Sequence, residues 1–304
     1  MSGVKELVQS INRLREERQA VILAHNYQRP EVQDIADFVG DSLGLARQAA
    51  AADSQVIVFC GVHFMAETSA IINPDKTTLL PDLEAGCNLA DDITPAGLKT
   101  LKKLYPDAVV VTYVNSPAAV KAESDYCCTS GNAVQVVQSI DAAEIIFTPD
   151  KNLGRYVQKV TGKPLIIWEG CCSVHEGITR EQVLELKRLH PEAAVVAHPE
   201  CREEVLELAD EVASTSGMFR FAASTPNNEI ITLTEVAMEH PLSKRFPEKH
   251  FCFPRHEEPL CETMKMITLD KVERCLREMR PEVTIPVDIR ERALLAVERM
   301  LEIG

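Results

Sequence analysis

Three cysteines occur in the same local pattern along this chain. Cys87, Cys172 and Cys261 each begin the pattern Cys-x5-Ile-Thr, and the copies lie 85 and 89 residues apart. If equivalent loops meet about one axis, their thiols face one point and form a soft metal site with a fourth position open. Zinc and iron in a cluster both suit such ligands. We predict that these three cysteines bind a metal, and that the other seven are small core residues.

Polar side chains follow the first strand predicted in each repeat. They are His25 with Tyr27, Tyr113 with Asn115, and His198 with Glu200. Beside a metal, such a set can orient carboxylates and carry out general acid-base chemistry. We choose Glu200 as the base.

Hydroxyl side chains form a second repeated set. Ser42, Ser130, Ser214 and Thr215 lie in loops or at predicted helix starts. There they either cap the helix or bind an anion together with its free backbone N–H groups. The sequence leaves both interpretations open.

The elements that position these residues are themselves repeated. Residues 87–113 and 172–198 align without a gap. Thr94, Thr179 and Thr268 are predicted N-caps, and a helix follows each of them. Short β-branched runs near residues 21–23, 109–111 and 195–196 are typical of strands buried on both faces. Further strands are predicted at 56–59, 144–147 and 211–213, and again at 77–80, 164–167 and 251–253.

Strands that alternate with helices at this spacing indicate βαβ units. We predict an α/β fold of three homologous three-layer α/β/α units with parallel sheets, arranged about a pseudo-threefold axis. The first unit spans 1–90, together with a C-terminal helix at about 283–304 that docks back on it. The second spans 91–176 and the third 177–282. Ligands should bind beyond the carboxyl ends of the strands.

The composition excludes several classes of protein. The chain has 304 residues, of which 46 are acidic and 32 basic, so its formal charge is −14. That field repels phosphate backbones, so we expect neither a nucleic-acid partner nor a membrane partner. The N-terminus lacks the apolar stretch of a signal peptide, which favours a cytoplasmic protein. No Walker loop, GxGxxG, HExxH or GxSxG motif is present.

The segment from Ile22 to Asp37, which begins Ile-Leu-Ala-His-Asn-Tyr-Gln-Arg-Pro, closely resembles the quinolinate synthase family of bacterial and archaeal NAD synthesis. Gly40 to Leu43 extends the match. Similar segments cover the full chain: 64–67, 113–116, 129–130, 149–154, 172–175 and 198–201, and Cys261 with Met264-Lys265.

The resemblance implies a 4Fe-4S cluster on Cys87, Cys172 and Cys261, with one iron free to act as a Lewis acid on substrate. It implies condensation of iminoaspartate with dihydroxyacetone phosphate to quinolinate, phosphate and water. Tyr27 and Glu200 would move protons, with Tyr113 and His198 beside them in the catalytic set. The implied substrate ligands are His25, Ser42, Tyr113, Asn115, Ser130, His198 and Thr215; we add Glu200 and Ser214 to that set. We also expect transient contact with an enzyme that produces iminoaspartate.

One departure from the family concerns Gly170-Cys171-Cys172, where relatives often have Gly-His-Cys. The ligand lies seven residues before the N-cap threonine in the first and third repeats, and the same spacing from Thr179 selects Cys172. Cys171 should then face away from the shared axis.

Two other functions remain open from the sequence. One is a mononuclear zinc lyase or hydrolase on the same three thiolates, and the other is a non-catalytic metal or metabolite-binding protein.

Overall fold

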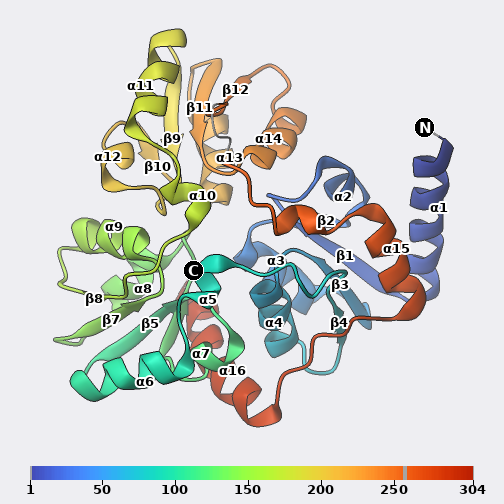
Figure 1. Ribbon diagram of the computed structural model, residues 1–304, viewed down its shortest axis with the longest axis horizontal. Coiled ribbons are helices and arrows are strands. Elements are labelled where there is room, and N and C mark those ends of the chain that lie inside the picture. The colour runs from blue at the N-terminus through green and yellow to red at the C-terminus, as the bar shows by residue number, and fades with distance from the viewer. Residues whose placement is uncertain (1, 256–258, 304) are drawn as a thin grey trace.

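Each repeat folds into a four-stranded parallel sheet with helices against it, which confirms the predicted fold class. The computed structural model describes residues 2–255 and 259–303. The strand orders are β2-β1-β3-β4, β6-β5-β7-β8 and β10-β9-β11-β12, so the three sheets share one topology. Figure 1 shows the three units as lobes around a common centre.

The first unit holds the N-terminal elements. Its strands are β1 (Ala20–His25), β2 (Phe38–Gly40), β3 (Val56–Cys60) and β4 (Thr77–Leu79). Its helices are α1 (Ser2–Glu17), α2 (Pro30–Ile35), α3 (Ser42–Ala51), α4 (His63–Ile72) and the short α5 (Asn88–Asp91). Strand β3 is buried along its whole length, as expected for an apolar run in a sheet covered on both faces.

The second unit repeats this order. Its strands are β5 (Val109–Tyr113), β6 (Tyr126–Cys128), β7 (Ile145–Thr148) and β8 (Ile166–Ile167). Its helices are α6 (Pro95–Leu104), α7 (Ala118–Lys121), α8 (Ala133–Ser139), α9 (Lys151–Thr161) and α10 (Ser173–Glu176).

The third unit and the C-terminal segment complete the chain. The strands are β9 (Ala194–Ala197), β10 (Glu211–Val212), β11 (Glu229–Leu233) and β12 (His250–Cys252). The helices are α11 (Arg180–Leu189), α12 (Glu203–Leu206), α13 (Thr215–Ser224), α14 (Glu239–Arg245), α15 (Leu269–Glu278) and α16 (Val287–Ile303), with 3-10 turns η1 (Val236–Met238) and η2 (Met264–Met266). No helix in the described ranges 2–255 and 259–303 is long and apolar enough to cross a membrane.

The repeat extends to hydrogen bonds that the sequence comparison missed. One aspartate before each edge strand accepts a bond of 2.8 Å from a backbone N–H of the first strand: Asp37 from Ile22, Asp125 from Val110 and Asp210 from Val195. One lysine per unit donates to carbonyls where a helix ends: Lys76, Lys163 and Lys249. The same contacts recur because the three units share one architecture.

The strand assignment in the third unit was wrong in one respect. The prediction makes residues 211–213 the third-unit equivalent of β3 and β7. In the structure these residues form β10, the edge strand that corresponds to β2 and β6. The true counterpart is β11, which the prediction omitted, as it omitted β2 and β6. Strand β2 is three residues long and largely exposed, so it has little of the apolar pattern by which buried strands are found.

All three predicted threonines are N-cap residues, and two of them make the capping hydrogen bond. Thr94 accepts a hydrogen bond from the N–H of Gly97, and Thr179 forms a full capping box with Gln182. Thr268 occupies the same position before α15 but makes no such bond. Its hydroxyl donates instead to Asp270, 2.6 Å away.

Helix α15 packs on the first unit, although the prediction placed it in the third. It contacts α1 and β3, and its buried Leu269, Val272 and Leu276 belong to the core that contains the first sheet. Helices α6 and α11 likewise follow a cysteine loop and pack on the sheet of the next unit. The chain therefore closes in a ring, because the helix after the third cysteine covers the first sheet.

Helix α16 docks mainly on the second unit, whereas we expected it on the first. It contacts α7, β6 and α8, and reaches the first unit at α4. Ala293, Val297 and Met300 are buried in the core of the second unit. This helix thus joins the first two units. Its apolar pattern alone does not show on which unit it packs.

Candidate active site

A cavity of about 80 Å³ lies at the centre, where the carboxyl ends of the first strands meet. His25 ends β1, Tyr113 ends β5, and His198 follows β9. All but one of the predicted site residues line this cavity: His25, Tyr27, Ser42, Cys87, Tyr113, Asn115, Ser130, Cys172, His198, Glu200, Thr215 and Cys261. The exception is Ser214, whose hydroxyl caps α13 by accepting a bond from the N–H of Gly217.

The three cysteines reach the cavity from three equivalent loops. Cys87 immediately precedes α5, Cys172 immediately precedes α10, and Cys261 lies shortly before η2. Cys171 does not line the cavity, and its backbone N–H contacts Asp92 instead. The loop therefore has the register that the spacing from Thr179 predicted.

Two sets of donors in the cavity could hold a metal. The three cysteine thiols supply soft ligands that suit zinc or an iron-sulfur cluster. Within the described chain, one group of three donors lies within 4.8 Å of one another, and it is Cys172, His175 and Glu200. The three thiols share the cavity but form no such group.

The environment keeps two of the thiols, Cys87 and Cys172, protonated in the absence of a cation. Burial raises the pKa of Cys87 to about 12, and burial together with the negative charge of Glu200 raises that of Cys172 well above its usual value. A metal would supply the positive charge that thiolates need at these positions.

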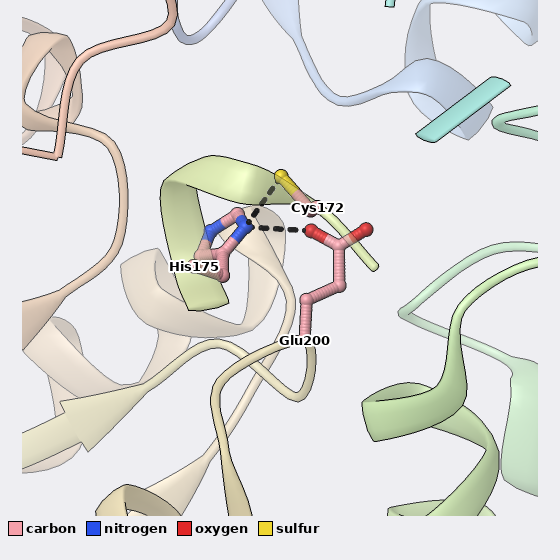
Figure 2. A group of neighbouring side chains, drawn as sticks. All are labelled: Cys172, His175 and Glu200. Atoms are coloured by element: carbon pink, nitrogen blue, oxygen red, sulfur yellow. Dashed lines mark hydrogen bonds and ion pairs between the residues drawn. The ribbon is translucent and has the colours of Figure 1, made fainter. Parts of the chain in front are cut away.

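His175 and Glu200 form a buried pair beside Cys172 (Figure 2). His175 Nδ1 lies 2.7 Å from Glu200 Oε2 and 3.3 Å from Cys172 Sγ. Burial alone would raise the pKa of Glu200, but His175 and His198 lower it well below its usual range. The other oxygen, Oε1, has no hydrogen-bond partner among the described residues. Glu200 is therefore ionised, and one of its oxygens has no partner within the described protein; contact with a substrate in place of the two histidines would raise its pKa and its strength as a base.

A chain of hydrogen bonds connects Tyr27 to this pair. The Tyr27 hydroxyl lies 2.6 Å from Thr234 Oγ1, and Thr234 Oγ1 lies 2.9 Å from His175 Nε2. If His175 donates from Nδ1 to Glu200, Nε2 must accept from Thr234, which leaves Thr234 to accept from Tyr27. Burial raises the pKa of Tyr27 well above its usual value, so Tyr27 is a donor.

Sequence analysis assigned no role to His175 or Thr234. His175 has a weak signal in the sequence, since it follows a predicted ligand in the pattern Cys-x2-His. Thr234 follows β11, the strand that the prediction omitted, so its position at a strand end was hidden.

His25 and His198 occupy equivalent places at the strand ends. His25 Nδ1 accepts a bond of 3.1 Å from the backbone N–H of Tyr27. Burial lowers the pKa of His25 to about 4, so this ring is neutral with its N–H on Nε2 and can donate to a carboxylate. His198 Nδ1 lies 3.3 Å from Glu200 Oε2, a contact in which the nitrogen donates. Burial followed by the nearby His175 lowers the pKa of His198.

Hydroxyls from the three units line another part of the cavity. Ser42 begins α3, Thr215 begins α13, and Ser130 precedes α8 by three residues. Thr215 is fixed by a bond of 3.1 Å from the amide of Asn26. Unpaired N–H groups at helix starts favour anions, so the cavity combines donors for anions with a carboxylate base.

Fold and site define a class: an α/β protein of three repeated units, with a buried central site of three thiols, neutral histidines and an ionised carboxylate. The chain belongs to the quinolinate synthetase A protein family, whose model matches residues 9–302.

Relatives match along almost the whole chain. The quinolinate synthase of Desulforudis audaxviator is 54% identical over 297 residues, which cover 97% of this chain and 98% of the relative. That of Methanosarcina barkeri is 54% identical over 299 residues, with 98% of both chains covered. That of Thermodesulfovibrio yellowstonii is 52% identical, again with 98% of both chains covered.

Proposed function

We propose that this protein is a quinolinate synthase that condenses iminoaspartate with dihydroxyacetone phosphate, releasing phosphate and water. One observation carries the proposal beyond family membership. A single cavity brings together three thiols, donors suited to anions, and the ionised Glu200 with its partner His175. Both proposed substrates are anions, and the condensation requires proton removal next to a carbonyl.

Cys87, Cys172 and Cys261 would hold a 4Fe-4S cluster. When bound, the cluster supplies a Lewis-acidic iron that polarises a substrate oxygen or nitrogen. The three thiols fit this group in number and in ligand chemistry, and all three line one cavity.

The protein's own residues bind the substrates and move the protons. Nε2–H of His25, together with the hydroxyls of Ser42, Ser130 and Thr215, donates to substrate carboxylates and phosphate. His198 contacts the substrate from the same cavity, beside Glu200. Tyr113 and Asn115 complete this wall of the cavity. Because its Oε1 is unpaired, Glu200 accepts the proton that enolisation releases.

Proton return uses Tyr27. Tyr27 carries its proton at neutral pH and lines the cavity, so during dehydration it turns this proton from Thr234 to the leaving hydroxyl. Thr234 and His175 connect Tyr27 to Glu200, so the proton that Glu200 took up can return along this chain to the tyrosine that lost one, once the hydrogen bonds have reversed.

The proposed setting is the cytoplasm, where an enzyme that oxidises aspartate supplies iminoaspartate by transient contact. The rival on the same thiolates, a mononuclear zinc lyase or hydrolase, is distinguished by metal analysis, which would find one zinc without sulfide instead of about four irons with sulfide.

The reaction can be tested directly. Protein purified without oxygen is mixed with dihydroxyacetone phosphate and freshly generated iminoaspartate, and quinolinate is measured by chromatography. We expect quinolinate and phosphate in equal amounts. A parent protein that retains its metal and forms no quinolinate would refute the proposed function, and would favour a binding protein.

A further inference from the structure

The segment 149–154, at the end of β7, resembles the family but has no part in the proposed chemistry. It lies where the second unit meets the loop that carries Glu200. Asp150 caps α9 through the N–H of Leu153 and also accepts a bond of 3.1 Å from the N–H of Cys172. Asn152, two residues after Asp150, is buried.

Asn152 connects two segments that have no strand pairing with each other. Its Nδ2 donates to the backbone carbonyl of Glu200 at 3.0 Å and to Glu176 Oε2 at 2.7 Å. Both partners are acceptors only, so the nitrogen rather than the oxygen of this amide must face them. The two protons of one planar group thus hold α10 and the Glu200 loop at a fixed separation.

This separation sets the geometry of the catalytic pair. Glu176 is the neighbour of His175 in α10, and the Glu200 carbonyl belongs to the residue whose side chain meets His175. Two sets of interactions therefore keep His175 and Glu200 together. One is their direct contact, and the other is the pair of hydrogen bonds that Asn152 makes to Glu176 and to the Glu200 carbonyl.

Comparison of the three units shows that the fold does not require an amide at this position. The helices or turns after β3, β7 and β11 have N-caps Val62, Asp150 and Glu235. Two residues further on, the three units have Phe64, Asn152 and Ala237. The polar side chain occurs only in the unit that faces the Glu200 loop.

We propose that Asn152 is a positioning residue for the reaction, and that it aligns Glu200 with His175 across the boundary between the second and third units. This inference rests on the proposed function of Glu200 as the base. Loss of the amide should lower kcat more than it changes KM, because Asn152 does not line the central cavity and bonds to Glu200 only at its backbone carbonyl.

The test compares Asn152→Asp and Asn152→Ala with a matched control, Lys151→Met. Lys151 lies on the same turn and pairs with Glu176 at 3.1 Å, but has no contact with Glu200. A misplacement of about 1 Å can cost up to about a hundredfold. We expect both Asn152 variants to lose about tenfold to a hundredfold in kcat, with KM within about threefold and iron content unchanged. Lys151→Met should match the parent.

Crystal structures of the same variants give a measurement that does not depend on activity. In the Asn152 variants the distance between His175 Nδ1 and Glu200 Oε2 should lengthen beyond about 3.5 Å, the limit of a hydrogen bond. If Asn152→Ala keeps both this contact and the parent kcat, the proposal is overturned. It is also overturned if Lys151→Met loses as much activity, because the effect would then run through Glu176. A parent protein that forms no quinolinate refutes the proposed function. The distance between His175 Nδ1 and Glu200 Oε2 in the variants would still show whether Asn152 positions Glu200.

Discussion

His175 Nδ1 lies 2.7 Å from Glu200 Oε2, although the two residues follow strands of different sheets. His175 is in α10, after the second sheet, and Glu200 follows β9 of the third. The pair exists only when the second and third units are packed together. Its formation therefore links the assembly of the fold to the chemistry at its centre.

Replacement of Glu200 tests the base directly. Glu200→Gln keeps the size of the side chain and the acceptor for His175 but removes the charge that takes the proton. Turnover should fall by about 10²-fold or more, the usual contribution of a general base, while iron content stays at the parent level. Steady-state quinolinate formation measures the effect. Activity within a few-fold of the parent would make Glu200 a structural residue.

Thr234 offers an isosteric test of the hydrogen-bonded chain. Thr234→Val removes the hydroxyl between Tyr27 and His175, and leaves two buried groups without a partner. An unpaired buried group costs about 1–3 kcal/mol of folding stability. Because the proton path is also broken, turnover should drop about tenfold or more. Thr234→Ser restores the hydroxyl and should recover most of the activity. Equal loss in the two variants would contradict the role of this hydroxyl.

The fold class and most of the residues that line the cavity could be predicted from the sequence, because the same unit occurs three times along the chain. The Cys-x5-Ile-Thr pattern located the three cysteine loops that meet at the cavity, and polar residues after apolar runs located much of its wall. What sequence analysis missed depends on packing between units. The contact of α15 with the first sheet and the partners of His175 come from elements far apart in the sequence, which local patterns do not encode.

The adjacent thiols Cys171 and Cys172 give a test of register. Cys172 lines the cavity and Cys171 does not. Cys171→Ser should therefore retain iron, sulfide and most activity, whereas Cys172→Ser should lose all three. Elemental analysis and the cluster absorbance provide the comparison. The reverse result would mean that this loop is shifted by one residue.

Burial of His25 predicts a dependence of stability on pH. Its pKa is lowered to about 4 in the folded protein, against about 6.5 when unfolded, so the unfolded chain binds the extra proton first. The stabilisation is complete above pH 6.5 and is lost as the pH falls towards 4, by at most about 3 kcal/mol.

Urea unfolding of the parent and of His25→Gln at several pH values isolates this effect, because changes at other groups are common to both. The parent should lose more free energy of unfolding than the variant between pH 6.5 and pH 4. Parallel curves would show that His25 is not held neutral by burial.

The central claim is that three cysteines from three units hold an iron-sulfur cluster at which quinolinate forms. The most direct measurement is the iron and acid-labile sulfide content of protein purified without oxygen, with quinolinate formation followed in the same sample. We predict about four irons and four sulfides per chain, and loss of both, together with quinolinate formation, in Cys87→Ala, Cys172→Ala and Cys261→Ala. One zinc per chain without sulfide, or full turnover in any of these variants, would contradict the account.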